Sequence, residues 1–146
     1  MDAKQILRDT RSKIREVAEL QRHLSALKKS VLPGGIRYDI DKVQSSTSDK
    51  ITEKFAAIGD LETELEQEIR DLTTDIYRAH RMIQSLSSPE QRRVLRAYYL
   101  PYIDAEDYMD DLPSWIEVAR SLHYSEAHIH RLHGNALQAL NKNESK

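Results

Sequence analysis

The fold of this chain is decided by one stretch, Ser114-Trp-Ile-Glu-Val-Ala-Arg-Ser-Leu-His-Tyr-Ser-Glu-Ala-His-Ile-His-Arg-Leu-His133. Apolar residues recur at helical spacing on both sides of a short polar break, which predicts two amphipathic helices joined by a tight turn, a helix-turn-helix. Ser114 and Ser125 each precede a helix as its cap, and Glu117 completes a capping box with Ser114. The positions predicted to be buried are Val118, Ala119 at the helix crossing, Leu122, Ile129 and Leu132.

A further helix is predicted immediately before this stretch. Ser88-Pro89-Glu90-Gln91 combines a capping serine with a proline in the first turn, and Pro101 ends the helix. Residues 101–111 then form a loop whose five charged residues are all acidic. The last helix is expected to reach about Leu140 and to be followed by a polar tail, residues 141–146. We therefore predict a C-terminal helix-turn-helix domain over residues 88–140.

Residues 1–87 show the pattern of two long helices. Apolar residues recur at alternating three- and four-residue spacings in both halves of this segment, and a repeat near 3.5 residues is typical of coiled coils. Residues 1–31 carry eight basic and four acidic side chains, and residues 51–87 carry four basic and eight acidic ones. The all-α chain is therefore expected to begin with an antiparallel coiled-coil hairpin. A coiled coil between two chains would use the same stripes.

The hairpin is expected to turn in a long mobile loop over about residues 33–49. Pro33-Gly34-Gly35 ends the first helix, and Ser48 or Asp49 can cap the second. In the register that we predict, Val17 faces Leu65. Three apolar residues near the end of the second helix then lie beyond the first helix and are expected to pack on the C-terminal domain: Ala79, Ile83 and Leu86.

Composition narrows the classes of protein. The 146 residues include no cysteine. Charged residues make up 32% of the chain and aromatic residues only 6%, a composition that favours long solvated helices. No catalytic constellation is present in the sequence, so we expect neither an enzyme nor a cofactor. Four histidines, His123, His128, His130 and His133, lack the spacing of a zinc site. No apolar run has membrane-spanning length, and the expected location is the cytoplasm of a bacterial host cell.

The C-terminal segments resemble region 4 of bacterial sigma factors. The resemblance lies in Arg93-Val-Leu-Arg-Ala-Tyr-Tyr-Leu100, Trp115-Ile-Glu-Val-Ala119 and Ile129-His-Arg-Leu-His-Gly-Asn-Ala-Leu137. The chain more closely resembles small phage proteins of Gram-positive hosts with a helical N-terminus, in the style of the RinA-type and ArpU-like late transcriptional regulators. This resemblance implies transcriptional control of phage genes by promoter binding, contact with RNA polymerase, or both.

In a helix-turn-helix the second helix enters the DNA major groove. With Ile129 on the core side, a helical wheel places Leu132, Ala136 and Leu140 beside it. Arg131 is the preferred contact, because arginine pairs bidentately with guanine or with phosphate. The residues predicted to contact DNA are Ser125, Glu126, Ala127, His130, Arg131, Gly134, Asn135 and Gln138.

Other side chains admit two interpretations. Arg92, Arg93 and Arg96 form a basic strip that could contact phosphates or a polymerase surface, or simply face solvent. Trp115 and the pair Tyr98-Tyr99 are expected to pack in the core rather than to stack on bases.

Two functions from different classes remain open. The first is a DNA-binding transcriptional regulator whose partners are double-stranded DNA, RNA polymerase or a second copy of the chain. The second is a protein-interaction adaptor that binds polymerase or another regulator without reading DNA. Glu126 and the acidic loop 101–111 favour the adaptor, because both oppose phosphate binding.

Overall fold

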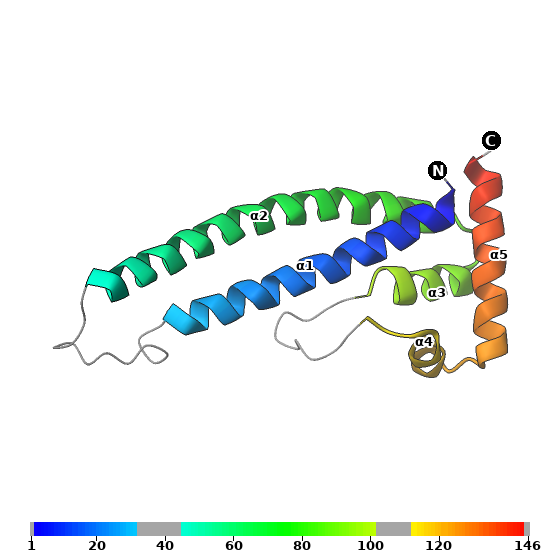
Figure 1. The fold of residues 1–146 in the computed structure, drawn as a ribbon. Helices are drawn as coiled ribbons and strands as arrows, with labels where there is room; N and C mark the ends of the chain where they lie inside the picture. The colour runs from blue at the N-terminus through cyan, green and yellow to red at the C-terminus, as the bar shows by residue number, and fades with distance from the viewer. Residues whose placement is uncertain (1, 32–44, 102–111, 145–146) are drawn as a thin grey trace. The chain divides into compact units, whose positions relative to one another are not determined.

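The computed structural model describes residues 2–31, 45–101 and 112–144. These residues form helices and no strand, so the predicted all-α class is confirmed (Figure 1). No helix among them is long and apolar enough to cross a membrane. The helices are α1 (Ala3–Val31), α2 (Ser45–Gln84), α3 (Pro89–Tyr99), α4 (Trp115–Leu122) and α5 (Glu126–Glu144).

Two helix ends differ from the prediction. The second helix begins at Ser45, so Ser48 and Asp49 lie inside it and do not cap it. The last helix continues to Glu144, four residues beyond Leu140. Hydrogen bonds explain the extension: Asn141 Oδ1 accepts from Ala3 N–H at 3.3 Å, and Asn143 Nδ2 donates to Ser85 Oγ at 3.4 Å. The rest of the predicted loop over 33–49 and nearly all of 101–111 lie outside the described residues.

The chain forms two compact units. One contains residues up to Glu16 together with Asp71 and the residues after it, and the other contains Val17–Arg70. In the first unit the three C-terminal helices are therefore packed with the beginning of α1 and the end of α2. The sequence predicts a boundary at residues 87 and 88, whereas these packing contacts continue on both sides of it.

The core of the first unit joins these helices. Its largest apolar cluster draws buried side chains from α1, α2, α3 and α5 and from the α2–α3 connection. Ala79, Ile83 and Leu86 pack with the C-terminal helices as predicted, but their cluster also includes two residues of α1, so they do not lie beyond that helix. The members of this cluster are Ala3, Leu7, Ala79, Ile83, Leu86, Leu95, Tyr99, Ala136 and Leu140.

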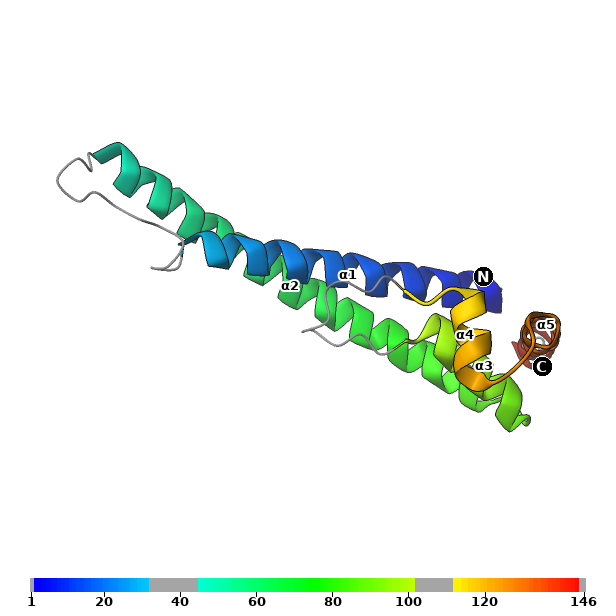
Figure 2. The same ribbon diagram turned by 90° about the horizontal axis from the view of Figure 1, so that it is seen from below.

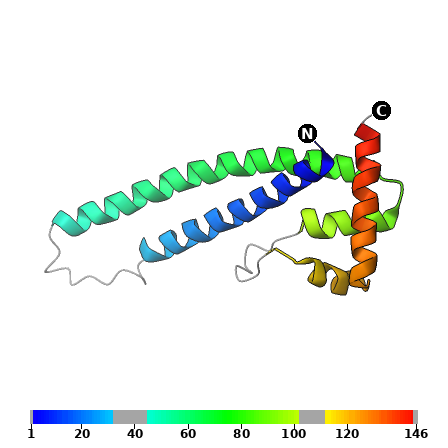
Figure 3. The same ribbon diagram turned by 45° about the vertical axis from the view of Figure 1, so that its right-hand side comes forward.

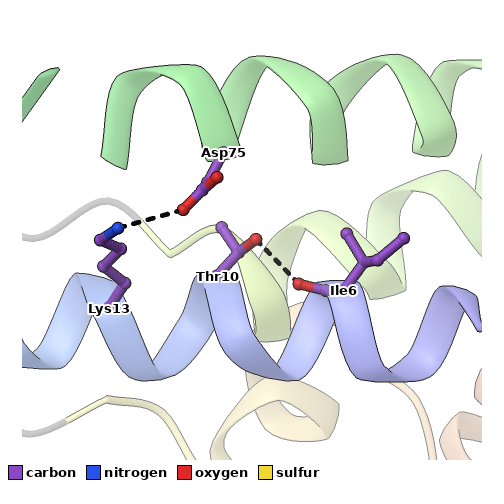
Figure 4. A network of polar contacts seen from close by, with 4 residues as sticks. All are labelled: Ile6, Thr10, Lys13 and Asp75. Atoms are coloured by element: carbon purple, nitrogen blue, oxygen red, sulfur yellow. Dashed lines mark hydrogen bonds and ion pairs between the residues drawn. The ribbon is translucent and has the colours of Figure 1, made fainter. Parts of the chain in front are cut away.

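Within the first unit, a polar contact shows how α1 and α2 are aligned. Lys13 Nζ lies 3.5 Å from Asp75 Oδ2 (Figure 4). The predicted register places Lys13 opposite Ile69 instead, six positions away along α2. Thr10, 2% exposed, lies one turn before Lys13, and its Oγ1 donates to Ile6 O at 2.9 Å, which satisfies its buried hydroxyl.

The second unit independently shows a shift of the register in the same direction. Lys28 Nζ lies 2.9 Å from Glu62 Oε1, whereas the predicted register places Lys28 opposite Lys54, eight positions away. The predicted register is therefore wrong by about one heptad. Registers one heptad apart present equivalent apolar positions. The observed register pairs Lys13 and Lys28 with carboxylates.

This register gives a crosslinking prediction. A Lys28→Cys/Glu62→Cys variant should form an intramolecular link with a short bis-maleimide, and the product should run as a compact monomer on denaturing gels. The control variant Lys28→Cys/Lys54→Cys should give little intramolecular product, because its second cysteine lies about two turns away. Equal yields from both pairs would contradict the register.

Candidate nucleic-acid interface

The turn between α4 and α5 is fixed by hydrogen bonds at both of its ends. Tyr124 N–H donates to Ala119 O at 2.9 Å and His123 N–H to Arg120 O at 3.3 Å, which is a Schellman motif. His123 has φ 61° and ψ 39°, so it occupies the left-handed region. Ser125 Oγ then accepts from His128 N–H at 3.1 Å and caps α5. Together these bonds end α4 and begin α5 within three residues.

The helices on both sides follow the sequence pattern. Ser114 Oγ accepts from Glu117 N–H at 3.2 Å, and Ser88 Oγ accepts from Gln91 N–H at 3.3 Å. Each of the helices α3, α4 and α5 contacts the other two (Figure 3). Their shared core consists of Val94, Val118, Ala119, Ile129 and Leu132, with Leu122 partly buried beside it. The predicted ridge and the small residue at the crossing are therefore confirmed.

The division of α5 into two faces also matches the helical wheel. Ile129, Leu132, Ala136 and Leu140 are buried. The opposite face is exposed, and between Glu126 and Gln138 it carries one glutamate and one arginine. Its exposed residues include all eight that were predicted to contact DNA, namely Ser125, Glu126, Ala127, His130, Arg131, Gly134, Asn135 and Gln138.

The helix α1 borders this face, which the sequence does not predict. A cleft of about 400 Å³ lies between the first turns of α1 and the helices α4 and α5. We call it the α1–α5 cleft; Lys4 and Arg8 line it from α1, Trp115 from α4, and His130 and His133 from α5. The basic residues of α1 that line the cleft recur every three or four positions, and the sequence predicts for them only pairing with the acidic second helix. That spacing was the available signal.

The wall of the cleft is aromatic. The Tyr98 and Trp115 rings stack with centroids 3.7 Å apart and an interplanar angle of 9°. Tyr99, 2% exposed, meets Tyr98 edge-on at 4.9 Å between centroids. The core-packing interpretation is therefore confirmed for Tyr99, whereas Tyr98 and Trp115 are partly buried, pack against the core and also line the cleft. Trp115 also lies against His133, with ring centroids 4.4 Å apart, and both residues line the cleft.

Arg11 attaches α1 to this wall. Its Nε donates to Tyr98 O at 2.9 Å and its Nη2 to Pro113 O at 2.6 Å. The guanidinium carbon lies 4.1 Å from the Tyr98 ring centroid, in cation–π contact. Tyr98 O is one of the last carbonyls of α3, and it has no N–H donor within the helix. Arg11 is thus a structural residue, although it belongs to the same basic stripe as Lys4 and Arg8.

His133 is held as a neutral ring. Its Nε2 lies 2.7 Å from Tyr99 Oη. Burial, with a smaller effect from the nearby charges of Lys4, His130 and Arg8, lowers the pKa of His133 to about 4. Burial, followed by Tyr98, raises the pKa of Tyr99 to about 12. At neutral pH the protonated phenol can therefore donate to an unprotonated imidazole.

The predicted arginine strip on α3 has mixed roles. Arg92 donates to Leu86 O, and Arg96 donates to Gln84 Oε1, so both guanidinium groups bind the end of α2 and the connection after it. Arg93 is exposed. All three line a second cavity of about 490 Å³ with Pro89 and Pro101. Of the three arginines, only Arg93 makes no such hydrogen bond with another residue that the structure describes, so it is the best placed for an outside partner.

Comparison with protein-family models, curated proteins and solved structures found no match to this chain. Among the described residues, no group of three or more His, Cys, Asp or Glu side chains is arranged to hold a metal ion.

Replacing Arg11 tests its structural role. Arg11→Gln should lower the free energy of unfolding by about 2 kcal/mol, because two hydrogen bonds from a charged donor are lost. Urea unfolding followed by circular dichroism measures this loss. The control Arg8→Gln, at an exposed position on the same helix, should change it by less than about 0.5 kcal/mol. Equal effects would show that Arg11 does not anchor α1.

The depressed pKa of His133 predicts a dependence of stability on pH. Above the ordinary histidine pKa of 6.5 neither the folded nor the unfolded state binds a proton at this ring. As the pH falls from 6.5 towards 4, only the unfolded state does, so stability falls. The His133→Gln variant cannot titrate there. After allowance for solvent screening of a half-buried ring, the wild type should lose about 1 kcal/mol more than this variant between pH 7.5 and 5 in urea unfolding. Identical losses would contradict the assignment.

Proposed function

We propose that the protein is a DNA-binding transcriptional regulator, of the kind found in phages and prophages, that reads a promoter with α5. In this proposal residues 88–140 act as a helix-turn-helix domain and residues 1–87 as a coiled-coil hairpin. The observation that carries the proposal is the division of α5 into a fully buried face and a polar exposed face. A helix held on one side by α3 and α4 can present the other to a DNA major groove.

The chemistry of the exposed face suits base contacts. Arg131 lies on the second turn of α5 and is exposed; a guanidinium can donate two hydrogen bonds to guanine O6 and N7. Asn135 follows one turn later, and its amide can both donate to and accept from adenine. Gly134 leaves its position on the helix open, with nothing within 4 Å of where a Cβ would stand. This gap allows a DNA backbone to approach α5 closely.

The adaptor remains the alternative, and one observation favours it. Ile116 on α4 is 54% exposed, so it offers an apolar side chain to a protein partner. Glu126 in the first turn of α5 adds a negative charge where a DNA phosphate would approach. The partner in that case would be RNA polymerase or another regulator.

The regulator hypothesis is tested by DNA binding of the full-length protein. Fluorescence anisotropy should detect a complex with a promoter fragment from its own genomic neighbourhood that resists excess random DNA. Arg131→Ala should weaken the specific complex by roughly 1–3 kcal/mol and leave binding to random DNA nearly unchanged, because a base contact carries discrimination. The matched control is Arg81→Ala, which removes an exposed arginine from α2. It should change the affinity neither for the promoter fragment nor for random DNA.

Two outcomes would contradict this reading of α5. If Arg131→Ala weakens specific and random complexes equally, Arg131 contacts phosphate rather than a base. If the wild type binds no DNA at low salt, the regulator hypothesis fails. Capture of purified RNA polymerase, lost on Ile116→Ser, would then support the adaptor. A dimeric regulator would in addition require half-sites about 34–36 Å apart.

A further inference from the structure

The α1–α5 cleft has the composition of an anion site. Lys4 and Arg8 are exposed on α1, one turn apart, and neither side chain makes a hydrogen bond or ion pair with another described residue. Ser12 continues the same line with a hydroxyl. None of the described residues that line the cleft is acidic. A group with several unshared oxygens and negative charge is the ligand that such a set of donors favours.

The cleft is also continuous with the proposed reading face. His130 lines the cleft and at the same time belongs to the exposed side of α5, next to Arg131. Its ring lies 5.6 Å from that of Trp115, between centroids. A ligand that occupies the cleft would therefore run alongside the residues proposed to read bases. This arrangement favours an extended polyanion over a small enclosed metabolite.

We infer that the α1–α5 cleft binds the phosphodiester backbone of the DNA that α5 reads, with Lys4 and Arg8 as its phosphate contacts. The inference rests on the proposed function and extends it, since it assigns phosphate binding to the N-terminal helix. The residues proposed to contact DNA carry little positive charge of their own. The eight residues proposed to contact DNA include one arginine and one glutamate, and phosphate contacts supply most nonspecific DNA affinity. Lys4 and Arg8 supply the missing cations.

Trp115 makes the cleft directly observable. It is the one tryptophan of the chain, and it lines the cleft. Trp115 fluorescence, excited at the red edge of protein absorption, should change when a short random-sequence duplex binds. In Lys4→Gln/Arg8→Gln, the slope of log affinity against log salt should fall by about 2, because two phosphate contacts are removed. The Trp115 response should weaken in parallel.

The control variant is Lys50→Gln/Lys54→Gln, which removes two exposed cations from α2 and should keep the wild-type slope and response. Thermal melting establishes that both variants are folded, as the exposure of all four side chains predicts. Inorganic pyrophosphate serves as the second probe. It should compete only weakly for the Trp115 response, since it offers the same oxygens without an extended backbone.

The outcomes separate the two proposals. If the duplex binds the wild type and Lys4→Gln/Arg8→Gln with equal slopes, the cleft inference fails while DNA binding stands. If the duplex does not bind but pyrophosphate changes Trp115 fluorescence in a Lys4- and Arg8-dependent way, the regulator proposal fails. The cleft then serves a small phosphorylated ligand, and the backbone assignment is overturned. A reduced slope in this variant alone supports the inference.

Discussion

The contact on which the candidate interface depends is the one that Arg11 makes with the end of α3. A single guanidinium bonds two backbone carbonyls, from Tyr98 and Pro113, and lies over the Tyr98 ring. It thereby holds the first turns of α1 beside α4 and α5 (Figure 2). On the side of α5 the same turns are held by Ala3 and Leu7, which share a buried cluster with Ala136 and Leu140. Arg11 adds a polar attachment to α3 and to the segment before α4, so that Lys4 and Arg8 lie on a part of α1 that is packed on two sides.

Much of the structure of α3, α4 and α5 could be predicted from the sequence, because its signals are local. The serine caps at 88, 114 and 125 need only a hydroxyl two or three residues before an amide. The buried face of α5 follows from helical periodicity alone. The exposure of Arg131 follows from the same periodicity. These features are confirmed because no distant part of the chain is needed to specify them.

The α1–α2 register and the cleft could not be predicted in the same way, because both depend on contacts between distant segments. A heptad repeat leaves the register free to shift by seven residues. The ion pairs of Lys13 with Asp75 and of Lys28 with Glu62 identify the register that is adopted. The cleft requires knowledge of which helix α1 packs on. The basic stripe of α1 can be seen in the sequence, but the opposite charge of the second helix already accounts for it, so nothing in the sequence points to a cleft.

The left-handed residue at the turn has a consequence for how such turns are identified in other chains. Glycine is common at this position because it has no Cβ to clash, yet here histidine occupies it. The hydrogen bonds from Tyr124 and His123 back to α4 hold the conformation, and histidine tolerates this region better than most residues. A search pattern that requires glycine would therefore overlook turns of this kind. The informative positions are the serine two residues later and the small alanine at the crossing.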